Sequence, residues 1–370
     1  MAKEKLSVHA VILAGGRGTR FWPRSRARTP KQLLNIVGKT TMVQQTVARL
    51  HSLIPNDHIW TVTNIDQAVA LKKQLPSATR KRVLVEPTGR NTTAAIALAA
   101  FHIQHAAKGD ALMAVLPADH FIAQTGRYRK IVRAALEVAK TPGRMVVLGI
   151  PPTRPDTAFG YIERIADPIT TNGFPVFPVH RFTEKPELDL AQEYVRSGDY
   201  HWNAGMFFWR VSTFLEALKG FLPKTYHALH ELAQHIDKPR YARKLKQIYP
   251  TLENISVDYA ILERATALSG ASRVFIIPAD IGWSDIGSWD AVYEHLAKRN
   301  GDNVLVGEGE ALDSTGNLFW SPQKFVAAVG IDDLIVIDTP DALLICPRSR
   351  AQDVGKIVKL LEQNKRKSLL

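Results

Sequence analysis

The stretch VHAVILAGGRGTRFWPRSRARTPKQLL, residues 8–34, places three glycines and five arginines directly after an apolar run. The apolar residues 8–13 predict a short strand that is buried on both faces of a sheet. The loop that follows therefore begins at the carboxyl end of a strand, and its glycines allow backbone N–H groups to turn toward an anion. Arg17, Arg20 and Lys31 add positive charge to the same loop. Together these features predict a site that cradles a polyphosphate.

Two common phosphate-binding motifs do not account for this loop. A dinucleotide-binding fingerprint that begins at Gly16 needs Gly or Ala at position 21, which is Phe21. The sequence Gly-Lys-Thr at 38–40 resembles the end of a P-loop, but the first glycine of that motif would fall at Leu33. A tight surface turn would explain two adjacent glycines, but it accounts less well for the full GGRGTR sequence.

Outward from this loop, the first 150 residues alternate between short apolar runs and helix-like segments. This alternation predicts a mainly parallel sheet with helices on both sides. The predicted strands are 8–13, 59–63, 82–85, 111–116 and 145–149, and the predicted helices are 41–53, 65–74, 91–105 and 128–140. Ligands bind such sheets outside the carboxyl ends of the strands. The loops after Leu13, Val85 and Leu116 should therefore form the site.

The rest of the chain is less regular. Strands are predicted at 161–165, 179–182, 206–210 and 274–277, and helices at 189–197 and 257–267. We interpret this part as an insertion that completes the sheet and covers the site. Beyond about residue 300, short runs at 303–306, 325–329, 334–337 and 342–345 predict a small β module, closed by a helix over 351–364. The predicted domains are therefore 1–295 and 296–370.

Composition limits the class of protein. The 370 residues are 45% hydrophobic and 22% charged, as in ordinary globular proteins, and no apolar run approaches the ~18–20 residues of a membrane span. The first residues lack the apolar core of a secretory signal, and Cys346 is the only cysteine, which excludes an intramolecular disulfide. The net charge of +13 is spread along the chain without a nucleic-acid-binding motif. We expect a cytoplasmic protein with neither a nucleic acid nor a membrane as partner.

Glu86 ends the third predicted strand in the sequence VEPTGRNT. A carboxylate only accepts hydrogen bonds, and guanine offers adjacent N1–H and N2–H₂ donors that one carboxylate could accept together. Uracil and thymine offer one donor between carbonyl groups that would repel the charge. Glu86 therefore favours a guanine nucleotide, although it could instead pair with Arg82 or Arg90. Asn91, at the start of a predicted helix, could contact the nucleotide or cap the helix.

Asp119 follows the predicted strand 111–116 in the sequence LPADH. A carboxylate at that end of a strand points into the expected site and suits Mg²⁺, which prefers oxygen ligands. The alternative is a turn aspartate or a helix cap. His120 is interpreted as structural, because a histidine beside an aspartate does not by itself make a catalytic pair.

Seven short motifs occur in order over about three-quarters of the chain, ending at residue 289. They are LAGGRGTR, VEPTGRNT, PADH, FGYI, FTEKP, WNAGMF and WSDIGSW. Each motif alone is weak, but the ordered set resembles the sugar-1-phosphate nucleotidyltransferases, and among them the mannose-1-phosphate guanylyltransferases. The resemblance implies an α/β fold: a Rossmann-like nucleotidyltransferase domain with a mostly parallel mixed sheet, followed by a small C-terminal β module that would be a left-handed β-helix. Phe21 departs mildly from the family, which often has leucine there.

The resemblance also implies an activity: transfer of GMP from GTP to mannose 1-phosphate, with Mg²⁺, in a homodimer. Because the attacking group is already an anionic phosphate oxygen, catalysis should depend on positioning and charge stabilisation. The implied catalytic residues are Arg20, Lys31 and Lys185, and the implied metal ligands are Asp119 and Asp285. The implied nucleotide contacts are Leu13, Gly15, Gly16, Gly18, Thr19, Glu86, Asn91 and Asp119. The implied sugar-phosphate contacts are Gly160, Glu184, Lys185, Asn203 and Asp258.

Other interpretations remain open at this stage. Glu184 and Lys185 could form a surface ion pair, and Asp258 could simply begin a helix. The enzyme could use another nucleotide and sugar, or the chain could be a non-catalytic nucleotide-sensing subunit that keeps the fold. Longer members of the family carry a C-terminal isomerase domain. Because this chain ends before such a domain, we expect no phosphomannose isomerase activity.

Overall fold

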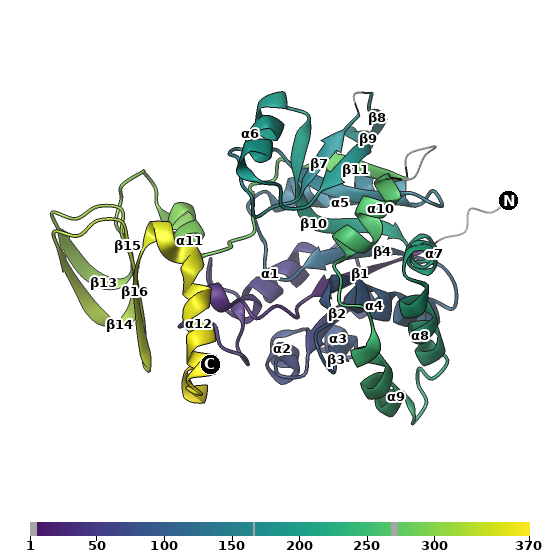
Figure 1. Ribbon diagram of the computed structural model, residues 1–370, viewed down its shortest axis with the longest axis horizontal. Helices are drawn as coiled ribbons and strands as arrows, with labels where there is room; N and C mark the ends of the chain where they lie inside the picture. Colours follow the sequence, from purple (N-terminus) through teal and green to yellow (C-terminus); the bar gives the residue numbers. More distant parts are fainter. Residues whose placement is uncertain (1–5, 166, 268–272) are drawn as a thin grey trace.

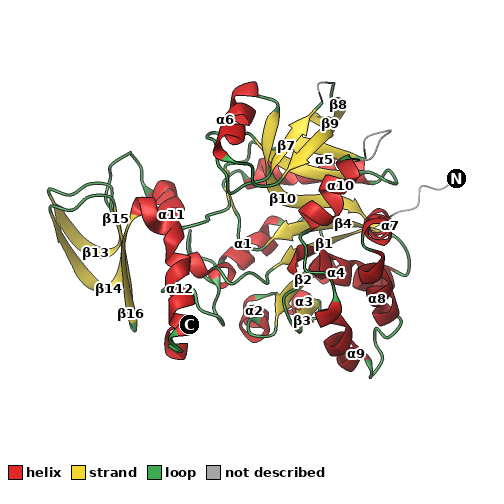
Figure 2. Ribbon diagram, viewed as in Figure 1, coloured by secondary structure: helices red, strands yellow, loops and turns green. Residues whose placement is uncertain are grey.

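The computed structural model describes residues 6–165, 167–267 and 273–370. Figure 1 shows a large α/β region beside a smaller β region, with the helices α11 (Trp289–Leu296) and α12 (Val354–Gln363) between them. The C-terminus lies at the end of α12, against the large region. The α/β class expected from the alternating pattern is confirmed, and Figure 2 shows strands in both regions and most helices around the larger sheet.

The large sheet contains ten strands, and its main path is β3-β2-β1-β4-β10-β6-β11-β9-β7, with β8 paired to β9. The strands are β1 (Ser7–Leu13), β2 (Ile59–Asn64), β3 (Val83–Glu86), β4 (Ala111–Pro117), β6 (Met145–Ile150), β7 (Tyr161–Arg164), β8 (Ile169–Thr171), β9 (Phe174–Thr183), β10 (Tyr200–Arg210) and β11 (Val274–Pro278). The strands β3, β2, β1 and β4 are parallel, as predicted. The strand β10 is antiparallel to both β4 and β6, so the sheet is mixed.

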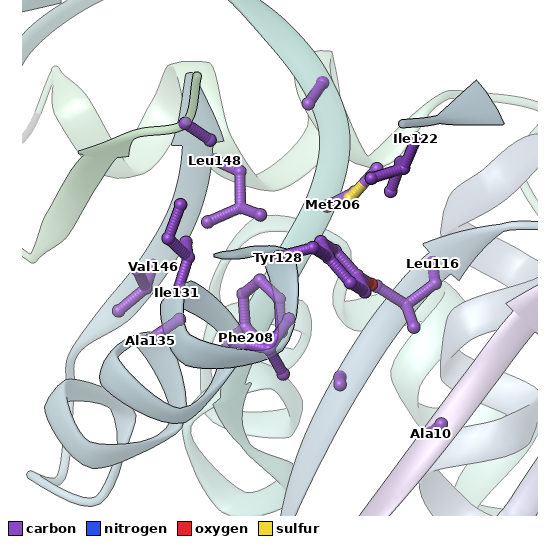
Figure 3. Close-up of a cluster of buried hydrophobic side chains, with 14 of the residues drawn as sticks. Ala10, Leu116, Ile122, Tyr128, Ile131, Ala135, Val146, Leu148, Met206 and Phe208 are labelled. Carbon is purple, nitrogen blue, oxygen red and sulfur yellow. The ribbon is translucent and has the colours of Figure 1, made fainter. Parts of the chain in front are cut away.

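Hydrophobic cores lie on both faces of this sheet. In β1, Ala10 and Ile12 belong to one core while Val11 belongs to the other, as the two-residue alternation of a strand requires. Helices α1 (Met42–Arg49) and α5 (Thr125–Ala139) pack on the first face, and α4 (Asn91–Ala107), α7 (Val211–Phe221) and α8 (Pro223–Ala233) pack on the second. Figure 3 shows Tyr128 and Ile131 of α5 directed toward the strands that they cover.

The helices between β10 and β11 are the main difference from the predicted elements. The structure has α7, α8 and α9 (Tyr241–Ile248) where no helix was predicted. The signal was present, because Val211, Phe214, Leu215 and Leu218 are buried at helical spacing. The predicted helix 257–267 is divided into a π-helical turn, η5 (Asp258–Leu262), and the short α10 (Glu263–Thr266). The remaining helices are α2 (Ala68–Gln74), α3 (Ser77–Arg80) and α6 (Leu188–Ser197).

The smaller region is a four-stranded sheet in the order β13-β14-β15-β16. Its strands are β13 (Val304–Leu312), β14 (Leu318–Val329), β15 (Leu334–Thr339) and β16 (Ala342–Pro347), of which the first three are parallel. A third core joins this sheet to the first loop, since Trp22 clusters with Trp289 and Trp320. Helix α11 lies almost entirely in the first predicted domain but also contributes to this core. The predicted domain boundary between residues 295 and 296 therefore stays a prediction.

Candidate active site

A cavity of about 520 Å³ opens at the carboxyl ends of β1, β3 and β4, the position predicted for ligand binding in this type of sheet. Twelve residues singled out from the sequence line it: Leu13, Gly15, Gly16, Glu86, Asn91, Asp119, Gly160, Glu184, Lys185, Asn203, Asp258 and Asp285. Gly18, Thr19, Arg20 and Lys31 are not among the described lining residues. The cavity therefore brings together residues that lie up to 272 positions apart in the sequence.

The backbone of the first loop is fixed by two features. Gly18 has a φ of 59°, and a Cβ atom there would lie 2.5 Å from the Cβ of Lys31, so the position requires glycine. The side-chain amide of Gln32 donates to the carbonyl oxygens of Ala14 and Gly16, each at 2.9 Å. Sequence reasoning missed Gln32, although it directly follows Lys31. The loop is thus held in place before any ligand arrives.

Lys31 is a buried cation that contacts two of the loops around the cavity. Its ammonium group is 2.9 Å from Oδ2 of Asp119 and 2.5 Å from the carbonyl oxygen of Asp285, and its side chain is only 6% exposed. Burial acts to raise the pKa of Asp119, but the Lys31 charge, with a smaller effect from His120, holds that pKa below its ordinary value. Lys31 therefore links two loops that both border the cavity.

A two-residue ladder brings the Asp285 loop to the end of β4, near Asp119. The strand β12 (Trp283–Ser284) pairs with β5 (Phe121–Ile122), and the Trp283 indole N–H donates to Nδ1 of His120 at 3.1 Å. These contacts agree with the structural role expected for His120. They also show that the WSDIGSW motif returns to the end of β4 and closes the cavity.

Asp119 and Asp285 are the carboxylates that could ligate Mg²⁺. Burial raises the pKa of Asp285, Lys31 opposes that effect, and the charge of Asp119 adds to it, so the two carboxylates interact. In the part of the chain that the structure describes, no group of three His, Cys, Asp or Glu side chains could hold a metal by itself. Mg²⁺ often binds one or two carboxylates together with waters and substrate phosphates, so this pair fits the ion when a nucleotide is bound.

Glu86 lies at one end of the cavity and is buried. The Tyr249 hydroxyl donates to its Oε1 at 2.6 Å, and its Oε2 lies beside Gly15. Burial raises the pKa of Glu86 to about 7, against the opposing effects of the Tyr249 hydroxyl and the backbone N–H of Arg90.

The alternative that Glu86 pairs with Arg82 or Arg90 is wrong. Arg82 donates to the carbonyl oxygen of Asp57, and the Arg90 guanidinium donates to the carbonyl oxygen of Pro250. Within residues 6–165, 167–267 and 273–370, Glu86 takes part in no ion pair.

Another part of the cavity lining presents oxygen and amide groups. A register shift in β10 between Asn203 and Phe207 coincides with Gly205, which has a φ of 64°. Such a bulge redirects side chains, and Asn203 donates to Oδ1 of Asp258 at 2.8 Å while it accepts from the Gly205 N–H at 2.9 Å. Burial, and then the charge of Glu184, raise the pKa of Asp258 to about 6.

Glu184 and Lys185 do form an ion pair, with a separation of 3.0 Å, but it is not an isolated surface pair. Glu184 is 11% exposed and Lys185 is 59% exposed, and both line the cavity. A Cβ atom at Gly160 would overlap the Glu184 carboxylate, so this glycine allows the two strands to approach. Lys185 has a φ of 50°, in the left-handed region that few residues with side chains adopt.

The structure places Arg20 differently from the sequence-based expectation. Its guanidinium donates to the side-chain oxygen of Gln352 at 2.7 Å, just before α12, and Arg20 is not among the described residues that line the cavity. It is still close enough to Asp285 to lower the pKa of that carboxyl. Asn91, which has a φ of 61°, lines the cavity while its Oδ1 accepts from the Thr92 N–H at 2.9 Å.

Comparison with known proteins places this geometry in a family. Residues 9–300 match the model of the nucleotidyl transferase family, and residues 307–361 match that of the MannoseP isomerase/GMP-like beta-helix domain. The chain belongs to the nucleotidyl transferase family. The second match confirms the predicted β-helix character of the C-terminal module, whose handedness stays a prediction.

Three relatives narrow the family further. Mannose-1-phosphate guanylyltransferase RfbM of Salmonella typhimurium is 38% identical, over 98% of this chain and 74% of the relative. Mannose-1-phosphate guanylyltransferase of Escherichia coli is 36% identical, over 99% of this chain and 75% of the relative. A crystal structure described as mannose-1-phosphate geranyltransferase from Thermus thermophilus has a TM-score of 0.85 and 32% identity, over 96% of this chain and 100% of that one. Within its family, the chain therefore groups with mannose-1-phosphate guanylyltransferases.

Among the described residues, no helix combines the length and the apolar character that crossing a bilayer requires.

Proposed function

We propose that this protein transfers GMP from GTP to mannose 1-phosphate, and thereby forms GDP-mannose and pyrophosphate. One observation carries the proposal: a buried lysine, Lys31, holds together Asp119 and the Asp285 loop, which line one cavity with two different sets of recognition groups. One set includes the Glu86 carboxylate, which suits guanine, and the other includes Asn203 and Asp258, which suit sugar hydroxyl groups. The names of the relatives support this pair of substrates.

The reaction forms a bond between a phosphate oxygen of mannose 1-phosphate and the α-phosphorus of GTP. The bond from that phosphorus to the bridging oxygen breaks, and pyrophosphate leaves with the electron pair. Because the nucleophile is already anionic, the protein needs no strong general base. Its residues must instead bring two anions together and neutralise the leaving group.

Lys31 is the residue best placed to neutralise the triphosphate, because its charge is fixed beside the first loop before binding. Asp119 and Asp285 would hold Mg²⁺, which supplies charge neutralisation on the phosphates when it is bound. Arg20 would also neutralise the phosphates, once its guanidinium donates to a phosphate oxygen in place of the Gln352 side chain. Thr19 and the N–H groups of Gly15, Gly16 and Gly18 would line the path of the phosphates, with Leu13 beneath.

The sugar phosphate would occupy the end of the cavity that holds Lys185. The ammonium group of Lys185 would orient the attacking phosphate, and Glu184 would accept hydrogen bonds from sugar hydroxyl groups. Asn203 and Asp258 are fixed by their mutual hydrogen bond, and so they present a defined edge to the ring. Gly160 leaves room for the ring to approach the backbone.

The test is pyrophosphate release with Mg²⁺, for each of the four ribonucleoside triphosphates with mannose 1-phosphate and glucose 1-phosphate. We expect release with GTP and mannose 1-phosphate. If UTP gave as much pyrophosphate as GTP, the enzyme would act on another substrate pair, and the argument that Glu86 selects guanine would be wrong. Folded protein that releases no pyrophosphate with any pair would support a nucleotide-sensing subunit instead. A homodimer and a cytoplasmic location, which the resemblance and the sequence suggest, belong to the same proposal.

A further inference from the structure

Two consecutive residues, Tyr249 and Pro250, form hydrogen bonds with Glu86 and Arg90, which line the part of the cavity proposed to bind the base. The Tyr249 hydroxyl donates to Oε1 of Glu86 at 2.6 Å, and the Pro250 carbonyl oxygen accepts from the Arg90 guanidinium. Tyr249 is fully buried in the 3₁₀ turn η4 (Tyr249–Thr251) and is not among the described residues that line the cavity. It therefore reaches Glu86 from the protein side and leaves the other side free for a ligand.

The hydrogen-bonding capacity of Glu86 matches guanine once Tyr249 is counted. An ionised carboxylate offers about four lone-pair positions. The Tyr249 hydroxyl occupies one of them, and the backbone N–H of Arg90 also acts on the carboxylate. At least two positions remain, and the Watson–Crick edge of guanine presents two neighbouring donors, N1–H and N2–H₂. A protonated carboxyl would instead place its own O–H against one of these donors.

We propose that Tyr249 is a positioning residue for guanine recognition, whose hydroxyl holds Glu86 in the orientation and the ionised state that accept both donors of GTP. The proposal rests on the assignment of Glu86 to the base in the proposed function. It adds a residue that does not touch the substrate and that lies 163 positions from Glu86 in the sequence.

The surroundings of Glu86 make its ionisation sensitive to this single hydroxyl. Burial raises the pKa of Glu86 to about 7, while the hydrogen bonds from Tyr249 and Arg90 act to lower it. In the described structure, the titratable group that acts on the carboxyl is Tyr249 on η4, while the Arg90 guanidinium before α4 and Tyr241 on α9 act on Tyr249. Without the hydroxyl, burial would dominate further and a larger fraction of Glu86 would be protonated near neutral pH.

The decisive variant is Tyr249→Phe, with kcat/KM for GTP measured from about pH 6 to about pH 8.5 at saturating mannose 1-phosphate and Mg²⁺. A hydrogen bond to a charged group accounts for roughly a 10- to 100-fold change in binding, so we expect a loss of about that size near pH 7. The loss should shrink as pH rises, because Glu86 then ionises in the variant as well. The preference for GTP over ATP should narrow, since the N1 atom of adenine accepts from a protonated carboxyl.

Tyr241→Phe is the matched control. It removes a comparable hydroxyl from the same group of helices, where Tyr241 hydrogen-bonds His102 at 2.5 Å. We expect its pH profile and its GTP preference to equal those of the wild type. In a Glu86→Gln background, Tyr249→Phe should change kcat/KM for GTP by less than about 2-fold, because the two side chains act as one unit.

The outcomes separate this proposal from the proposed function. Wild-type protein that does not use GTP would overturn the proposed function. Wild-type protein that uses GTP, with a Tyr249→Phe variant that keeps its pH profile and GTP preference, would overturn only the role of Tyr249. If Tyr249→Phe does not fold, 3-fluorotyrosine at position 249 preserves the shape of the ring and is a stronger donor. It should move the pH midpoint for GTP downward, and an unchanged midpoint would refute the proposal.

Discussion

The two ends of the cavity hold their charged groups in different ways. At the proposed nucleotide end, Lys31 is 6% exposed and already bonded to Asp119 and to the Asp285 backbone, and Glu86 is buried against Tyr249. At the proposed sugar end, Lys185 is 59% exposed, and its one ion-pair partner among the described residues is the neighbouring Glu184. Lys31 and Glu86 are therefore fixed by buried contacts before binding, whereas Lys185 is exposed and held by a single ion pair. This difference predicts that removing Lys31 or Glu86 will reduce activity more than removing Lys185.

The largest effect is expected for Lys31→Ala. The substitution removes a fixed positive charge from the phosphates, and loss of a preorganised electrostatic group typically costs about 10²–10³-fold in kcat. Single-turnover rates with GTP and mannose 1-phosphate measure this effect, and circular dichroism verifies that the variant folds. A kcat within about 2-fold of the wild type would show that the buried lysine serves only to hold Asp119.

Glu86→Gln is expected to have the next largest effect. The amide replaces one acceptor by a donor, so kcat/KM for GTP at pH 8 should fall about 10- to 100-fold. In the wild type, the pKa of about 7 means that protonation removes the accepting form as pH falls, so kcat/KM for GTP should decrease below pH 7. The Glu86→Gln variant should not show this decrease in kcat/KM for GTP below pH 7. A pH profile that is identical in both proteins would place the base elsewhere in the cavity.

The sequence predicted the parts of this site that depend on local pattern. Glu86 and Asp119 follow buried strands, and the carboxyl ends of parallel strands meet at one edge of a sheet, so their proximity followed from topology. The Gly18 requirement followed from the loop motif. The strands of the first 150 residues could be predicted because each is a continuous apolar run between helices.

The contacts that complete the site could not be predicted in this way. Tyr249 meets Glu86 across 163 positions and Arg20 meets Gln352 across 332, and neither contact has a periodic signature. Gln32 is an ordinary polar residue in sequence, and its role depends on where two carbonyl groups of the loop point. The helices over 211–248 are different, because their buried apolar residues recur at a helical spacing that is present in the sequence.

Lys185→Ala should have a smaller effect than Lys31→Ala and should act on the other substrate. Because Lys185 is exposed and pairs with one neighbour, its removal should raise the KM for mannose 1-phosphate about 10-fold. The KM for GTP should stay within about 2-fold of the wild-type value. Steady-state kinetics with each substrate varied in turn would measure both constants. Equal losses from the two lysine variants would contradict the proposed difference between the ends.

The smallest effect is expected where the nucleotide end meets the C-terminal helix. Arg17 and Glu362 form an ion pair at 2.6 Å, but their side chains are 52% and 38% exposed. Exposed pairs contribute about 0–1 kcal/mol, so Glu362→Gln should change the free energy of unfolding by less than about 1 kcal/mol in urea titrations. The variant should also keep the wild-type KM for GTP, because the first loop is held by Gln32 and Lys31 rather than by this pair. A KM for GTP that changes several-fold would extend the preorganised end of the cavity to α12.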